Sequence, residues 1–131
     1  DCHLGVNIMT NEIVLIYTVC GSVEEAEKIS HTLIRESLAA CTNYWPIHSM
    51  YMWKDDLVHD SEVSMIVKTT HEKMAEACRR IQELHSYELP CILTLSPTYV
   101  DPSYATWIIA ETKGSVSKDS SANSRELATE T

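Results

Sequence analysis

Hydrophobic and polar residues along this chain follow strand-like and helix-like periods in turn. The segments 12–20 (EIVLIYTVC), 62–69 (EVSMIVKT) and 90–97 (PCILTLSP) are rich in apolar residues, which predicts three strands covered on at least one face. A fourth extended segment, 41–53 (CTNYWPIHSMYMW), is rich in aromatic residues. Pro46 interrupts it, and because proline cannot donate a ladder hydrogen bond, we expect this strand at an edge, bent near Pro46.

Two further segments show the apolar spacing of amphipathic helices, and each begins with a capping signal. Ser22 with Glu25 three positions later forms a capping box ahead of the first stripe. Thr69 with Glu72 repeats this pattern ahead of a second stripe, which ends at Leu84. Each helix is therefore predicted to lie with its apolar side on a sheet.

The polar segment 54–61 (KDDLVHDS) separates two predicted strands and marks a turn. Asp55 and Asp56 are the expected turn residues, because aspartate tolerates a left-handed backbone better than most residues do. The strands 41–53 and 62–69 then form one long, bent hairpin.

A short helix is predicted near the end of the ordered chain. Asp101 is placed as its N-cap and Pro102 as its first residue, which is where proline is favoured. This helix is expected to direct three residues inward: Tyr104, Trp107 and Ile108. The pattern gives one domain over 12–111, preceded by an extension over 1–11 and followed by a polar, disordered tail over 112–131.

The order of elements is strand, helix, strand, repeated once. With right-handed crossovers this βαββαβ order gives an α+β ferredoxin-like sandwich, a four-stranded antiparallel sheet with two helices on one face. The other face and the aromatic residues of 41–53 are left uncovered. Because large apolar patches rarely stay exposed, we expect the chain to associate with copies of itself.

Charge and cysteine content limit the possible partners and the compartment. The formal net charge is −9, from ten Lys or Arg against nineteen Asp or Glu, so nucleic acid and anionic membranes are not expected partners. Five cysteines without a Cys-x-x-Cys pair indicate free thiols in a reducing compartment, and we expect the cytoplasm. A leader removed upstream of Asp1 is the alternative.

Four short strings occur in a fixed order within 12–110: 38–41 (LAAC), 51–54 (YMWK), 85–90 (HSYELP) and 104–108 (YATWI). In this order and spacing they resemble the CutA family, the divalent-cation tolerance proteins. The resemblance implies a homotrimer in which hairpin edges of neighbouring subunits extend each other's sheets. It also implies a non-enzymatic binding or regulatory module in the response to divalent metal ions, with copper as the expected ion.

The resemblance implies a metal site that this chain retains only in part. In bacterial relatives copper is assigned to a cysteine in the first strand and to a His-His pair that ends the second helix. The matching positions here are Tyr17, Leu84 and His85, so His85 is the one predicted metal ligand.

Other ligand combinations are disfavoured by their spacing. His71 and Cys78 continue the His85 register at intervals of seven residues, and seven residues span about 10 Å of helix, too far for one metal ion. Met74 with Cys78 is interpreted as core packing. The remaining histidines are interpreted as surface or turn residues: His3, His31, His48 and His59.

The matched strings also contain a group of polar and aromatic residues. We expect a small-molecule cleft between subunits, lined by Tyr51, Trp53, Lys68, Tyr87 and Glu88. The alternative is structural: Lys68 and Glu88 form an interface ion pair, and the aromatic residues anchor the interface.

Two other functions stay open besides metal tolerance. One is a nucleotide-sensing trimer similar to the PII regulators, whose ligand-responsive loop would have to be the short segment 54–61. The other is a scaffold that assists the assembly or anchoring of other proteins. Catalysis is not expected, because the chain has three glycines, no Gly-x-Ser-x-Gly elbow and no glycine-rich phosphate loop.

Overall fold

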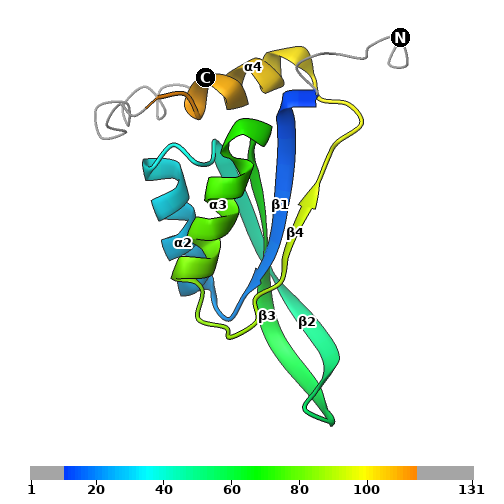
Figure 1. The fold of residues 1–131 in the computed structure, drawn as a ribbon. Coiled ribbons are helices and arrows are strands. Elements are labelled where there is room, and N and C mark those ends of the chain that lie inside the picture. The colour runs from blue at the N-terminus through cyan, green and yellow to red at the C-terminus, as the bar shows by residue number, and fades with distance from the viewer. Residues whose placement is uncertain (1–10, 115–131) are drawn as a thin grey trace.

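The computed structural model describes residues 11–114 of the chain. It consists of a four-stranded antiparallel sheet, two helices on one face of the sheet and a third helix across one end (Figure 1). The elements are β1 Ile13–Cys20, α2 Val23–Arg35, β2 Cys41–Trp53, β3 Asp56–Thr70, α3 His71–Leu84, β4 Ile92–Leu95 and α4 Pro102–Glu111. Most of the predicted extension 1–11 and of the predicted tail 112–131 lies outside the described residues.

The strand order is β2-β3-β1-β4, which confirms the ferredoxin-like prediction. β1 occupies a central position and pairs with β3 over its whole length and with β4 over four residues. Pro46 lies on β2, an edge strand, as expected from its missing N–H. The β2–β3 register runs through Pro46 opposite Val63 without a bulge.

The main core lies between the sheet and the two helices. Ile16, Ile29, Leu33, Met65 and Ile81 are among its fully buried members. A second apolar cluster lies under α4 and includes three residues: Ile13, Val100 and Ile108.

The prediction for the inward face of α4 is partly wrong. Ala105 and Ile108 are buried and Trp107 is half-buried, but Tyr104 is 38% exposed. Its phenol reaches sideways over the sheet to Lys68, whose ammonium donates to the Tyr104 hydroxyl over 3.2 Å. The polar end of the ring therefore stays near water while α4 buries its smaller residues.

The cap of α3 lies one residue later than the sequence pattern predicted. Thr70 is the N-cap, and its hydroxyl oxygen accepts a hydrogen bond from the Lys73 N–H over 3.3 Å. Thr69 is buried and donates its hydroxyl to the Leu38 carbonyl over 2.7 Å instead. Both hydroxyls are satisfied, but only Thr70 caps the helix.

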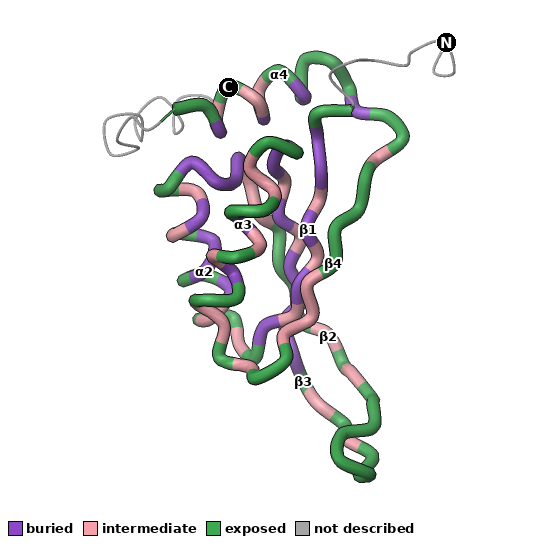
Figure 2. The backbone as a smooth tube through the Cα atoms, in the orientation of Figure 1, coloured by how far each residue is buried: buried purple, intermediate pink, exposed green. Residues whose placement is uncertain are grey.

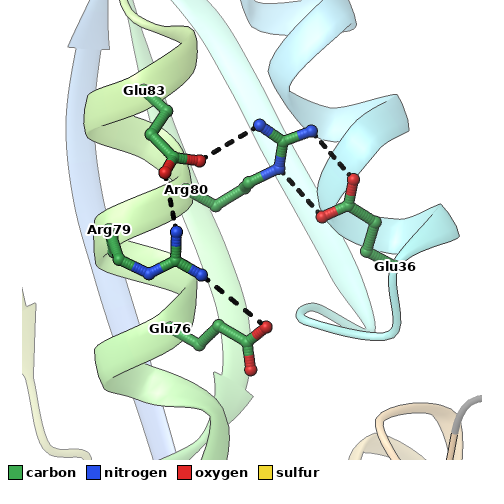
Figure 3. A network of polar contacts seen from close by, with 5 residues as sticks. All are labelled: Glu36, Glu76, Arg79, Arg80 and Glu83. Atoms are coloured by element: carbon green, nitrogen blue, oxygen red, sulfur yellow. Dashed lines mark hydrogen bonds and ion pairs between the residues drawn. The ribbon is translucent and has the colours of Figure 1, made fainter.

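Charged residues join the two sheet-covering helices at the surface (Figure 3). The guanidinium of Arg80 on α3 holds both carboxylate oxygens of Glu36, the C-cap of α2, at 2.9 Å each. These hydrogen bonds lower the pKa of Glu36. Arg79 pairs with Glu76 and Glu83 one turn away on either side. Arg80 is thus the one member of this network that bridges two helices.

The β2–β3 hairpin is longer than predicted and extends well past the two helices (Figure 1). The prediction of a turn over 54–61 is wrong, because β3 begins at Asp56, directly opposite Trp53. Only Lys54 and Asp55 form the turn, with φ of 49° and 70°, so Asp55 and not Asp56 needs the left-handed backbone. Most of the projecting part is exposed (Figure 2).

Candidate functional site

A cavity of about 590 Å³ lies where the hairpin leaves the sheet, beside the loop that connects α3 to β4. Tyr51, Trp53 and Tyr87 supply aromatic surface to it. Its carboxylates come from Asp60, Glu62 and Glu88. Strand alternation explains the hairpin's part, because Tyr51 and Trp53 on β2 and Asp60 and Glu62 on β3 project from the same face of the ladder.

Four of the five residues predicted for a cleft meet at this cavity within one subunit. They are Tyr51, Trp53, Tyr87 and Glu88. Lys68 is not among the lining residues. It lies six positions beyond Glu62 along β3, about 20 Å away at strand spacing, and donates to Tyr104 instead. The Lys68–Glu88 ion pair is accordingly not formed within the subunit.

The cavity is acidic, and two of its carboxylates are held by tyrosines. The Tyr51 hydroxyl donates to Asp60 over 2.7 Å, and the Tyr87 hydroxyl donates to Glu62 over 2.5 Å. Among the described residues, no Lys, Arg or His lines the cavity. Burial and then the Glu62 carboxylate raise the pKa of Tyr87, so its phenol stays protonated at neutral pH. A cation is favoured here over an anion.

A second group of titratable side chains adjoins the cavity. Cys20 ends β1, Glu25 lies in the first turn of α2, and His85 is the C-cap of α3. Their potential ligand atoms all lie within 4.8 Å of one another. The ring of His85 lies 4.8 Å from that of Tyr87, which connects this group to the cavity wall.

Sequence reasoning singled out His85 but missed its two neighbours. Glu25 was recognised only as a capping residue, and its carboxylate does accept the Gly21 N–H over 2.8 Å. The other carboxylate oxygen accepts the Ser86 N–H over 2.7 Å. A strand end, a helix start and a helix end meet here, and only the sheet topology brings them together.

The types of donor in this group suit a transition metal, but their present bonds do not. The His85 side chain is fully buried, with Nε2 2.7 Å from the Val19 carbonyl and Nδ1 accepting the Tyr87 N–H over 3.1 Å. Burial and the Glu25 charge raise the pKa of the Cys20 thiol to about 12, so it is protonated at neutral pH. Both ring nitrogens of His85 are therefore already engaged, and neither offers a free lone pair to a metal ion.

The Glu25 carboxylate also has its hydrogen-bond partners already. Burial acts to raise its pKa, but the hydrogen bonds from Gly21 and Ser86 outweigh that effect, and the pKa of Glu25 is lowered. A metal ion would have to displace a hydrogen bond at one His85 nitrogen and the proton of the Cys20 thiol. The group does not fit a metal ion as it stands, because its thiol is protonated, its imidazole nitrogens are engaged and its carboxylate is stabilised by two backbone N–H groups.

The two other positions of the implied copper set also hold no ready ligand. Tyr17 shares a 2.5 Å hydrogen bond with the Ser64 hydroxyl. Leu84 packs against the main core.

The sheet order, the long hairpin and the cavity define a ferredoxin-like protein with an acidic, aromatic cavity at the root of a projecting hairpin. The sequence profile of the family described as CutA1 divalent ion tolerance protein matches residues 14–111. The chain therefore belongs to the CutA1 family, as the four sequence strings indicated.

Individual relatives agree with this assignment. The divalent-cation tolerance protein CutA of Pyrococcus horikoshii is 37% identical over 101 residues, which are 77% of this chain and 99% of the relative. The CutA protein of Archaeoglobus fulgidus is 39% identical over 93 residues, 71% of this chain and 91% of the relative. The crystal structure of CutA1 from Ehrlichia chaffeensis superposes with a TM-score of 0.77 at 33% identity, and the match covers 79% of this chain and 98% of that one. No helix within residues 11–114 has the length and apolar character needed to cross a bilayer.

Proposed function

We propose that this chain is a non-enzymatic binding or regulatory module in divalent metal ion tolerance, and that it binds cations in the acidic cavity. The single observation that carries the proposal is the composition of the cavity wall. Three carboxylates and three aromatic rings line it without a basic side chain among the described residues. Oxygen donors with excess negative charge favour divalent cations. Family membership and the names of the relatives support the same function.

The working form proposed is a homotrimer in the cytoplasm. Large apolar side chains remain exposed on the sheet and hairpin of a single subunit, among them Trp45, Leu93 and Leu95 at 39%, 56% and 49%. Such surface favours burial against another copy. Trp53 and Tyr51, which line the cavity, are themselves exposed, so a neighbouring copy is expected to narrow the cavity.

A nucleotide-sensing function is disfavoured by the same wall. A phosphate chain would face the carboxylates of Asp60, Glu62 and Glu88 with no cation from the lining residues. The loop that would have to clamp the nucleotide is only the two-residue turn Lys54–Asp55.

Calorimetric titration of the full chain with Cu²⁺, Zn²⁺ and ATP tests the proposal. We expect both metal ions to bind and ATP not to bind. Glu88→Gln removes one charge from the cavity wall and is expected to weaken metal binding about fivefold, since an exposed charge contributes at most about 1 kcal/mol. Glu27→Gln, on the exposed side of α2, is the matched control.

Three results would contradict the proposal. They are ATP binding tighter than metal binding, no metal binding at all, and equal affinities in the Glu88 and Glu27 variants. His85→Ala is included because His85 is the ligand that the family resemblance predicted. Unchanged metal affinity in that variant would remove His85 from the account and leave the cavity in place.

A further inference from the structure

The outer face of the hairpin brings together side chains that the sequence had left isolated. The register places Met50 directly opposite His59, and His48 directly opposite Ser61. Directly opposite residues share one face of the ladder, and so do residues two apart on a strand. His48, Met50 and His59 therefore project from one face, opposite to the face that carries Tyr51 and the acidic cavity.

These three side chains are close enough to meet at one ion. Met50 and His59 are directly opposite each other, and the Cβ atoms of such a pair lie about 4.5–5.5 Å apart. His48 and His59 are diagonal neighbours, and the residues of such a pair lie about 7–8 Å apart, still within reach of long side chains. A smaller cavity of about 250 Å³ lies on this part of the hairpin, lined by His48, Met50, His59 and Asp60 with two serines.

The donors are also free to bind. Both histidines are exposed, and Met50 is 63% exposed, so solvent reaches the thioether sulfur as well as the imidazoles. No side-chain hydrogen bond or ion pair described within residues 11–114 uses the His48 or His59 imidazole. His85, by contrast, is buried with both ring nitrogens engaged.

Two imidazoles and one thioether form a soft donor set. Thioether sulfur selects Cu(I), imidazole suits copper and zinc, and carboxylate or water suits harder ions. We propose that the face formed by His48, Met50 and His59 is a copper site, which binds the ion most tightly as Cu(I). The ion is expected to draw the exposed side chains together by rotation about their χ angles, which open solvent permits. This inference rests on the proposed function, for which it names a preferred ion and a second site.

Competition for Cu(I) against a chromophoric cuprous chelator, in the full chain with ascorbate, tests the site. Changes outside the ligand shell already cost about 10–100-fold in metal affinity, so His48→Gln and His59→Gln are each expected to lower Cu(I) affinity by at least about tenfold. His31→Gln, an exposed histidine on α2, is the control and is expected to change nothing. Equal affinities in the wild type and the two hairpin variants would overturn the proposal.

Met50→Leu tests the sulfur while preserving the size of the side chain. We expect it to weaken Cu(I) binding about tenfold and to leave Zn²⁺ binding unchanged, because zinc gains little from a thioether. Met74→Leu on α3 is the matched control. Among the methionine ε-methyl NMR signals, that of Met50 should shift with the first equivalent of Cu(I). An unshifted Met50 signal, or equal losses for copper and zinc, would refute the assignment.

The two sites fail separately in this design. Cu(I) binding that falls in the Glu88→Gln variant and survives in the His48 and His59 variants would refute the hairpin site and leave the cavity proposal standing. Loss of Cu(I) binding in the His48 and His59 variants alone would support the hairpin site, and equal Cu²⁺ and Zn²⁺ affinities in the Glu88 and Glu27 variants would then refute the cavity separately. All substituted hairpin side chains are exposed, and a circular dichroism spectrum confirms that each variant is folded.

Discussion

Replacement of Tyr87 by phenylalanine is expected to destabilise the fold measurably, although it removes a single oxygen atom. That oxygen donates to Glu62 over 2.5 Å, and Glu62 is only 7% exposed. Phenylalanine keeps the ring packed on His85 and leaves the Glu62 carboxylate without this donor. A hydrogen bond to a charged group contributes about 1.5–3 kcal/mol. Because Tyr87 is itself partly exposed and water can replace part of the donation, we expect a loss of about 1.5–2 kcal/mol.

Urea unfolding followed by circular dichroism measures this loss. With a slope of about 2 kcal/mol per molar urea, the transition midpoint of Tyr87→Phe should fall by about 0.8–1 M at pH 7.5. Both proteins must be compared at the same concentration, because dissociation of an oligomer contributes to the apparent stability.

The difference between the two proteins should also depend on pH. The pKa of Tyr87 is raised in the folded chain, first by burial and then by Glu62, so the folded state favours the protonated phenol. The stability that this shift contributes is fully present below the unfolded tyrosine pKa of about 10 and is lost as pH rises through the folded value. The gap in unfolding free energy should therefore stay constant from about pH 7 to 9 and shrink above about pH 10.

Tyr51→Phe is the matched control, since Tyr51 also donates to a carboxylate, that of Asp60, over 2.7 Å. Tyr51 is exposed on the hairpin, so water can take the place of its hydroxyl, and we expect little change in stability. Equal losses in the Tyr87 and Tyr51 variants would show that burial of Glu62 does not determine the effect. An unchanged midpoint for Tyr87→Phe would refute the reasoning altogether.

Three further predictions follow from burial and backbone geometry. Ile81→Ala removes a fully buried core side chain and should cost about 2–5 kcal/mol in the same urea assay; a loss below about 1 kcal/mol would contradict its place in the core. The buried Cys20 thiol, with its pKa raised to about 12, should react with a maleimide more slowly than Cys41 at pH 7.5, as peptide mapping by mass spectrometry would show; equal rates would argue against its burial. Lys54→Asn combined with Asp55→Gly should raise the thermal midpoint, because a left-handed backbone costs most residues about 1–2 kcal/mol and Asn-Gly is the pair favoured in this type of turn. An unchanged midpoint would mean that the turn is unstrained.

The strands and helices were predictable because their apolar residues face one common core. The runs that became β1 and the buried end of β3 are apolar, and the stripes of α2 and α3 repeat at helical spacing. The outer half of the hairpin has no such core. Residues 56–61 are polar enough to be taken for a turn, yet they pair with 48–53 because a two-residue turn brings the strands into register.

The site was predictable only where its residues lie within recognisable strings. Tyr51, Trp53, Tyr87 and Glu88 belong to such strings and meet at the cavity. Lys68 also belongs to the predicted set, but the register places it opposite Cys41, ten positions before Tyr51 on β2, and residue type does not reveal that register.

The proximity of the hairpin histidines could not be predicted from the sequence either. His48 and His59 are eleven positions apart in sequence, and they become diagonal neighbours only once the turn is fixed at Lys54 and Asp55. A turn assigned to Asp55 and Asp56, as the sequence suggested, shifts the pairing by two residues and places His59 opposite Met52.

The register of this hairpin also explains how one ribbon can carry two kinds of donor without mixing them. Successive residues of a strand project to opposite faces, so a slip of one residue in β3 would carry its acids to the face of His48 and its histidine to the face of Tyr51. The ladder as it stands keeps oxygen donors and aromatic rings toward the cavity and keeps nitrogen and sulfur donors on the outer face. Hard and soft metal ions differ in their preference for these donors. The two-residue turn therefore fixes more than the shape of the hairpin, because it determines which donor atoms each face offers to the ions proposed above.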